Sequence, residues 1–587
     1  DVAIAVSASI LASMLVAITV IPTASARLNF GNRGGGSDAD ERGVRGRVLA
    51  GVRGLIASRP RRGATLLATV AASFAVIYWL TPPAEYLPEG EEAKTFAQMN
   101  APPGYNLATM HAIGQEIQAE FLPHLDKQPA AFERGETDIP ALKYFIMFVR
   151  PQLVFVIAES KDPDHIFPLM DVIQERFQRY PGMRAFASRG SIITSNEGGT
   201  RSINLDISGP RLASIYDAAA SAYDRAQAIF DTPRIQARPA TLSLSQPMVE
   251  VHPDWDRASE LGLSAQELGF TVAALTDGAF VDEFFLDDDK IDIFLYGETG
   301  PDVGLDGLGQ IPVHTPQGTT LPLSALADIR ETVDTSNVRR IDGRRTVTLN
   351  IIPPRDVPLE TGIQRVREEV VAHLRRTGDI PNDVAVTISG ASDQLQATRE
   401  ALEANYLVAG ALIYLLMVAI FRHWGYPLLI MTAIPLGVAG GILGLRLMNW
   451  IGAGLPLVGL NAIHQPFDMI AMLGFLILMG TVVNNPILIV HRAVANAREA
   501  GMAAREAVTE AVSSRLRPIA MSTITTIFGL APLVVIPGEG TELYRGVGAI
   551  VLFGILGAAV VALTFLPALT VAVLRWRERR LPDGHTG

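Results

Sequence analysis

The chain has 587 residues, 49% of them hydrophobic, with a formal net charge of −11 and a mean hydropathy of +0.26. It contains no cysteine, which excludes disulfides and cysteine-based metal sites. No P-loop motif and no nucleophile–base arrangement occurs, so we expect neither an ATPase nor another enzyme, and no cofactor, bound metal or nucleic acid.

Seven apolar segments are long enough to cross a bilayer, whose hydrocarbon core needs roughly 20 helical residues. They lie near residues 2–22, 64–81, 403–421, 427–448, 468–490, 518–537 and 546–574. The first segment begins with Asp1 and lacks the basic region of a signal peptide. We therefore expect an α-helical polytopic membrane protein and a chain that is a fragment.

A basic loop after the first segment predicts the orientation. Residues 23–63 contain three acidic residues and nine arginines, which are Arg27, Arg33, Arg42, Arg45, Arg47, Arg53, Arg59, Arg61 and Arg62. Such loops remain in the cytoplasm, and this one is expected to include a basic amphipathic helix lying on the inner leaflet. The same orientation makes the tail, residues 575–587, cytoplasmic and places the region 82–402 outside.

This outer region differs from the rest of the chain in charge and in pattern. Residues 81–400 include 47 acidic and 28 basic residues. Strand-like alternation and helical periodicity follow one another in three strand–helix–strand units, at 144–190, 201–246 and 345–390. We expect a large periplasmic α+β insertion of split βαβ, ferredoxin-like type, with helices on one face of each sheet, and a five-helix bundle at 403–574.

Several strings resemble the resistance–nodulation–division (RND) efflux permeases. The most specific are "MGTVVNNPILIV", "SSRLRPIAMSTITTIFGLAPL" and "GEGTELYRGVGAIV", and "YLPEGEEAKTFAQMNAPPGYNL" agrees with them. The seven predicted spans resemble helices six to twelve of the family's twelve. The resemblance therefore implies a C-terminal part whose N-terminal half lies upstream of Asp1.

The family resemblance also implies a function and partners. A homotrimer in the bacterial inner membrane would take amphiphilic small molecules from the periplasm or the outer leaflet of the lipid bilayer. It would pass them, with a periplasmic adaptor protein, to an outer-membrane channel, and proton import would drive the process. The family layout assigns porter subdomains to 83–250 and 310–400 and a docking subdomain to about 250–309.

Two adjacent asparagines are the first candidates for the proton relay. Asn484 and Asn485 lie within a predicted span, where unpartnered amide side chains are costly. They can instead join helices by hydrogen bonds, and this alternative stays open. By resemblance, Asn484 occupies the position of a lysine in drug-exporting relatives. Pro486 is expected to free the carbonyl of Val482 and to bend the helix.

The sixth segment adds hydroxyls and basic residues. Ser522 matches the family's relay hydroxyl, whereas Thr523, Thr525 and Thr526 are expected to bond to the preceding helical turn. Arg515 and Arg517 flank the start of this helix as interfacial anchors, and the resemblance implies a weaker role in proton release. None of the spans is expected to bury a carboxylate, since Asp468 lies at an edge.

Two alternatives remain from other classes. One is a periplasmic module that helices merely anchor in the membrane. The other is a related exporter of metal ions or lipids. Export of soft metal ions is disfavoured because the outer region has only six scattered methionines, Met99, Met110, Met147, Met170, Met183 and Met248.

Overall fold

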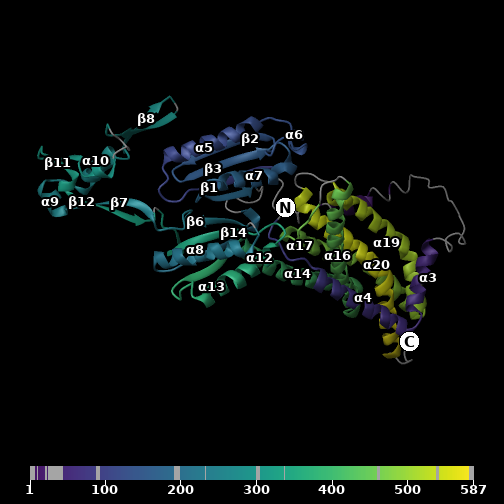
Figure 1. The fold of residues 1–587 in the computed structure, drawn as a ribbon. Helices are drawn as coiled ribbons and strands as arrows, with labels where there is room; N and C mark the ends of the chain where they lie inside the picture. The colour runs from purple at the N-terminus through teal and green to yellow at the C-terminus, as the bar shows by residue number, and fades with distance from the viewer. Residues whose placement is uncertain are drawn as a thin grey trace.

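The computed structural model describes residues 7–8, 11–19, 23, 44–87, 93–190, 199–231, 233–287, 289–298, 304–335, 337–458, 463–536 and 541–580. Within these residues the chain forms a helical bundle and, beside it, a set of α/β domains (Figure 1). In Figure 1 the bundle lies on the right, and the hairpin that includes β8 projects from the far end of the α/β domains.

Six helices among the described residues are long and apolar enough to cross a membrane. The elements that make them up are α4 (Arg59–Leu80), α14 (Ala391–Phe421), α15 (Gly425–Met431), α16 (Ala433–Gly454), α17 (Met469–Val482), α18 (Asn484–Arg498), α19 (Ala504–Val535) and α20 (Thr541–Arg580). They match six of the seven predicted segments, and the predicted span 2–22 is described only in part, at residues 7–8 and 11–19, which are helical.

The expected start of the sixth segment is wrong. Helix α19 begins at Ala504 rather than near 518, so Pro518 lies inside the helix. The stretch before Pro518 is amphipathic, and its small and branched side chains, which include Ala507 and Val508, are buried. This packing stabilises about four further turns, which hydropathy alone does not predict.

The basic amphipathic helix exists, but its apolar face does not face lipid. Helix α3 (Val44–Ile56) has Val52 and Ile56 only 3% and 2% exposed. They belong to a core cluster with residues of α18, α19 and α20. The apolar face of α3 therefore packs on the bundle, and the expected position of this helix at the inner leaflet stays a prediction.

The first α/β domain has one four-stranded antiparallel sheet. In chain order its main elements are β1 (Lys94–Asn100), α5 (Leu107–Phe121), β2 (Leu142–Arg150), β3 (Leu153–Ser160), α7 (Ile166–Gln178) and β4 (Arg184–Arg189), with short helices η1 (Leu122–His124), α6 (Ala130–Glu133) and η2 (Pro163–His165). The strand order is β2-β3-β1-β4. Helices α5 and α7 share one core with the sheet, and α7 contributes Leu169, Ile173 and Phe177 at helical spacing.

The second α/β domain repeats this order from two distant segments. It contains η3 (Gly199–Arg201), β5 (Ile203–Ser208), α8 (Leu212–Ile229), β6 (Arg234–Arg238), β13 (Arg340–Ile341), β14 (Arg344–Ile352), α12 (Leu359–Arg365), η6 (Val366–Val371), α13 (Ala372–Thr377) and β15 (Ala385–Gly390). Strand β14 pairs with both β5 and β6, and β15 pairs with β5. The second and third predicted units therefore form one sheet.

A separate subdomain is inserted between β6 and β14. Its elements are β7 (Gln246–Pro253), α9 (Trp255–Glu260), α10 (Ala265–Leu275), β8 (Ala279–Leu286), β9 (Asp289–Leu295), α11 (Leu305–Leu308), β10 (Pro312–His314), β11 (Thr320–Pro322), η5 (Leu323–Ala325) and β12 (Ala327–Asp334). Strand β12 pairs with β7, and Val313 and Leu323 share a core with Ala258 and Leu268. The subdomain thus extends over 246–334, beyond the predicted range of about 250–309.

Within the bundle, glycines allow α16 and α20 to approach each other closely. A β-carbon on Gly440 would lie 3.1 Å from the carbonyl oxygen of Phe553 and 3.2 Å from the α-carbon of Gly557. Small residues at such crossings are typical of membrane helices, where backbone packing replaces the hydrophobic effect. This contact fixes α20 against α16 and so helps to position the helices around the cavity described next.

Candidate functional site

A cavity of about 500 Å³ lies among the helices of the bundle. One wall is apolar and comes mainly from α14. The polar residues around it come from the α17–α18 region and from α19, namely Thr481, Asn484, Asn485, Ser522, Thr523 and Thr526. The structure therefore brings together three of the predicted relay candidates, Asn484, Asn485 and Ser522, which lie on different helices.

The two asparagines lie where the helix is interrupted. Helix α17 ends at Val482 and α18 begins at Asn484, as the position of Pro486 predicts. Asn485 is 7% exposed, whereas Asn484 is exposed in this chain. Neither amide side chain forms a hydrogen bond with another described residue. Hydrogen bonds that would join helices through these amides are therefore not present in the described part of the chain.

The hydroxyls on α19 differ from one another. Ser522 donates to the carbonyl of Ile519 at 3.0 Å, and Thr526 donates to the carbonyl of Ser522 at 2.9 Å. Thr523 is 7% exposed, and its Oγ1 is buried without a hydrogen-bond partner. The expected bond of Thr523 to the preceding turn is thus wrong, while that of Thr526 is present. The sequence predicts the same bond for Thr523 as for Thr525 and Thr526, because the three threonines have the same local pattern.

The two arginines of the predicted site do not line the cavity. Arg515 and Arg517 precede Ser522 on α19 by seven and five residues, which is about 10 Å and 7 Å along the helix axis. Arg517 is exposed, and Nε of Arg515 is buried without a partner. Because α19 begins at Ala504, both lie inside the helix rather than at its start.

A buried ion pair connects the bundle to the second α/β domain. Glu85, just after α4, lies 3.3 Å from Arg201, which precedes β5, and the two side chains are 10% and 8% exposed. Glu85 also accepts a hydrogen bond from the backbone N–H of Leu359 at 3.1 Å. Arg201 donates to the carbonyl of Val357 at 2.6 Å. We call this contact the junction, and sequence analysis gave no signal for it.

A buried carboxylate lies next to the junction. Asp468 is fully buried and accepts a hydrogen bond from the N–H of Ala471 at 2.6 Å, which caps α17. The residue before Asp468 is bonded to the junction, because Glu85 donates its N–H to the carbonyl of Phe467 at 2.9 Å. Asp468 therefore lies at the edge of its span, as expected, and it is buried there. An aspartate before an apolar helix is a recognised N-cap signal, and it could have indicated this role.

A second cavity lies between the two α/β sheets. It has a volume of about 360 Å³ and is lined by Gln98, Asn100, Leu153, Gln236, Ala237, Arg238, Pro239, Ala240, Asn337 and Arg339. Amide and guanidinium groups provide its polar surface, and no carboxylate, imidazole or thioether is among its lining residues. We call it the inter-sheet cleft.

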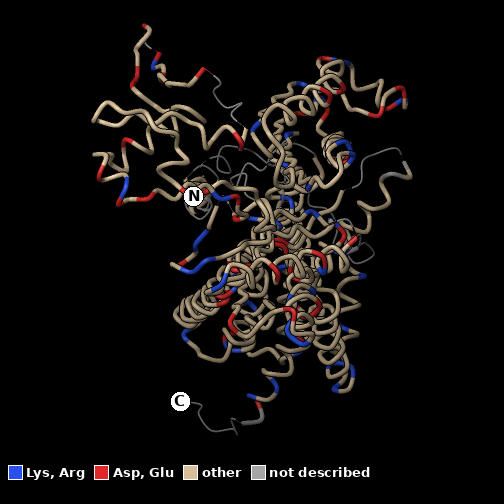
Figure 2. Tube along the Cα trace, turned by 60° about the vertical axis from the view of Figure 1, so that its left-hand side comes forward, with Lys and Arg blue, Asp and Glu red and all other residues tan. Residues whose placement is uncertain are grey.

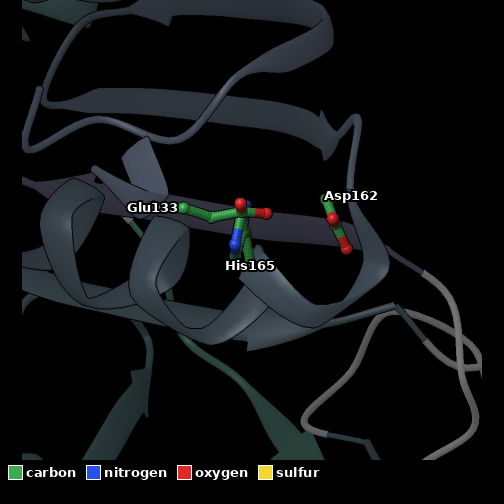
Figure 3. Close-up of side chains that lie close together, drawn as sticks. All are labelled: Glu133, Asp162 and His165. Atoms are coloured by element: carbon green, nitrogen blue, oxygen red, sulfur yellow. The ribbon is translucent and has the colours of Figure 1, made fainter. Parts of the chain in front are cut away.

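Three possible metal-binding side chains meet elsewhere in the first α/β domain (Figure 3). Ligand atoms of Glu133, Asp162 and His165 lie within 4.8 Å of one another. Asp162 also accepts a hydrogen bond from the N–H of Asp164 at 3.0 Å, as the cap of a short helix. Nδ1 of His165 is buried without a partner, and its ring packs against Phe132. Oxygen and imidazole ligands would suit a divalent transition metal.

Comparisons with known proteins agree with this architecture. A sequence model of the AcrB/AcrD/AcrF family matches residues 1–574. The cobalt-zinc-cadmium resistance protein CzcA of Cupriavidus metallidurans is 28% identical over 329 residues, which is 55% of this chain and 29% of that relative. The cation efflux system protein CzcA of an Alcaligenes species matches equally.

The fold is also that of a solved pump. The crystal structure of a heavy metal efflux pump matches with a TM-score of 0.68 at 18% identity, over 91% of this chain and 52% of that chain. The present chain therefore spans about half the length of that pump.

Proposed function

Because the chain belongs to the AcrB/AcrD/AcrF family of RND permeases, we propose that it is the C-terminal part of a proton-driven efflux permease of the bacterial inner membrane. In this proposal the α/β domains lie in the periplasm, and a first half supplies the remaining helices and the acids of the proton relay. The common βαββαβ order of the two sheets supports a split βαβ, ferredoxin-like porter.

The bundle cavity is the observation that supports the proton path. It combines the amides of Asn484 and Asn485 with the hydroxyls of Ser522 and Thr523 beside an apolar wall. Amides and hydroxyls cannot carry a net proton at neutral pH, but they can hold and orient water. We infer that they position water between the relay acids of the first half and the membrane surface. Arg515 and Arg517 lie outside this cavity and have at most an indirect part.

The inter-sheet cleft supports an amphiphilic organic substrate. Its lining residues include the guanidinium groups of Arg238 and Arg339 and no carboxylate, so they offer divalent cations no charged ligand, while its amides can bind neutral or anionic polar groups. Met99, Met110 and Met170 are fully buried in the core of the first α/β domain, so their thioethers are not available to a passing soft metal ion. We therefore propose export of amphiphilic or hydrophobic compounds.

Export of divalent cations is the second candidate. The names of the two CzcA relatives favour it, and so does the group of Glu133, Asp162 and His165. Transport assays separate the two, as described below.

Assembly as a trimer is supported by the hairpin β8–β9. Its strands expose large apolar side chains over their whole length, among them Phe280, Val281, Phe284, Phe285, Leu286, Ile291, Phe294 and Leu295. A projecting apolar hairpin of this kind is typical of an interaction site. We propose that it packs against a neighbouring copy, and that the assembled docking subdomains meet an outer-membrane channel with the help of an adaptor protein.

The test uses the whole permease, with its first half restored, in proteoliposomes with an imposed pH gradient. We expect uptake of an amphiphilic dye and no gradient-dependent movement of Co²⁺ or Zn²⁺. Asn484→Leu and Ser522→Val should abolish dye transport per trimer, because they remove polar groups of the cavity. Thr564→Val is the matched control, since Thr564 donates to the carbonyl of Val560 on α20 and does not line the cavity.

Two results would contradict the proposal. Gradient-dependent transport of Co²⁺ or Zn²⁺ without dye transport would favour the cation exporter. If Asn484→Leu and Ser522→Val reduce only the amount of folded trimer, they act as helix contacts of about 0.6 kcal/mol each, and the cavity has no role in the proton path.

A further inference from the structure

Four arginines from three parts of the chain lie near one another at one end of the bundle. They are Arg59 and Arg62 in the first turn of α4, Arg505 in the first turn of α19, and Arg575 near the end of α20. We call them the arginine cluster. Ala504 and Leu574, the neighbours of Arg505 and Arg575, share a core cluster with Ile56, whose carbonyl Arg62 contacts. Arg62 itself is only 5% exposed. This end of the bundle is the one distant from the α/β domains (Figure 1).

Backbone carbonyls accept hydrogen bonds from two arginines of the cluster, but they carry no negative charge that would offset its positive charge. Arg62 donates through Nη1 to the carbonyl of Ile56 at 3.2 Å, and Arg505 donates through Nη2 to the carbonyl of Ala57. Nε of Arg505 is buried and has no hydrogen-bond partner. Within the described residues, none of the four arginines forms an ion pair with a carboxylate. Burying a charge without a counter-charge costs several kcal/mol.

The local backbone makes the site more positive. Each helix N-terminus acts as roughly half a positive charge, and α4 has no acidic residue in its first turn. Glu506 is in the first turn of α19. Its side chain is exposed and lines a neighbouring cavity with Arg53, Glu510 and Arg505 of the cluster. Two glutamates therefore share that cavity with Arg505, whereas Arg59, Arg62 and Arg575 are not among its lining residues.

The cluster lies at the level of a membrane surface. Trp576, which follows Arg575, is 56% exposed, and Leu67 and Phe74 farther along α4 are 73% and 71% exposed. Tryptophan is enriched at the bilayer interface, and exposed apolar side chains on a spanning helix face lipid. Figure 2 shows both basic and acidic residues along the chain just before its C-terminus.

We propose that the arginine cluster binds a phosphate group, supplied by the headgroup of an anionic phospholipid. Guanidinium groups bind phosphate oxygens through two parallel hydrogen bonds, so Nε of Arg505 would gain the acceptor that it lacks. Basic pockets between membrane helices are known sites for anionic headgroups. The bound lipid would join α4, α19 and α20, which otherwise repel one another at this end.

The experiment measures thermal unfolding of the delipidated, detergent-solubilised chain during titration with dioleoyl phosphatidylglycerol. Dioleoyl phosphatidylcholine and inorganic phosphate are the parallel titrants. We expect a saturable rise in Tm with phosphatidylglycerol. Arg62→Gln and Arg575→Gln should each weaken apparent binding about fivefold, since one basic residue near an anionic surface contributes about 1 kcal/mol. Arg575→Gln keeps the test valid if Arg62→Gln does not fold.

Arg47→Gln on α3 is the matched control, because Arg47 is exposed and lies outside the cluster. It should bind phosphatidylglycerol like the unchanged protein. If millimolar inorganic phosphate produces the same rise and competes with the lipid, the cluster binds phosphate from solution, and the phosphate site itself is supported. Equal effects of both lipids on the unchanged protein, or equal weakening by Arg47→Gln, would overturn the proposal.

Discussion

The junction between the bundle and the second α/β domain allows a quantitative test. Glu85→Gln removes the charge of one partner while keeping an oxygen for the N–H of Leu359. Because Glu85 and Arg201 are 10% and 8% exposed, the change removes a buried carboxylate that this buried guanidinium contacts. Breaking such a pair costs about 3–5 kcal/mol. For a cooperative unit of about 150–250 residues, this cost lowers Tm by about 6–20 °C.

A second ion pair near the same place is the control. Glu360 lies 3.2 Å from Arg399, with side chains 45% and 57% exposed, and it accepts the N–H of Ala84 at 2.8 Å. Glu360→Gln therefore makes the same chemical change in a solvated pair, which is worth about 0–1 kcal/mol. Its Tm should fall by no more than about 4 °C.

Tryptophan fluorescence of the purified protein, followed during heating in detergent, reports both changes. The double variant Glu85→Gln with Arg201→Met should be more stable than the sum of the two single changes implies, because it leaves no buried charge. The reasoning fails if Glu85→Gln lowers Tm no more than Glu360→Gln does, or if the double variant is simply additive.

Three further predictions concern the bundle and its orientation. Gly440→Leu should destabilise the bundle by about 1–3 kcal/mol through overpacking, while Gly529→Leu, which has open space around it, should not; equal Tm values would refute the close contact. Asp468→Ala should cost about 0.5–2 kcal/mol as a lost N-cap, and Asp468→Asn should retain the cap, so an equal loss of Tm in both would contradict the capping role. In spheroplasts a membrane-impermeant thiol reagent should label Ser259→Cys and not Ala500→Cys, both at exposed positions; the reverse pattern would invert the proposed topology.

The candidate site was partly predictable. Asn484, Asn485 and Ser522 stand out because polar side chains are rare in apolar segments, and they do line one cavity. Thr523 was indistinguishable from its neighbours, since the carbonyl that a hydroxyl reaches depends on its rotamer and on the helices around it. Arg515 and Arg517 were placed at a helix start because Pro518 is a common first-turn residue, but packing before Pro518 extends the helix.

The sequence by itself determined the local secondary structure, and it determined which regions are apolar spans and which are polar α/β domains. Runs of apolar residues are sufficient to identify the six spans among the described residues, because the bilayer imposes their length. Alternating patterns likewise predict the strands and helices of the α/β domains.

Tertiary structure alone decided how distant segments meet. Pairing of β14 with β5 joins two predicted units in one sheet. Glu85 forms an ion pair with Arg201, which lies more than a hundred residues away in the sequence. The arginine cluster likewise forms only because three helix ends converge. Such contacts depend on which surfaces remain to be buried after each element has formed, and no local pattern encodes that choice.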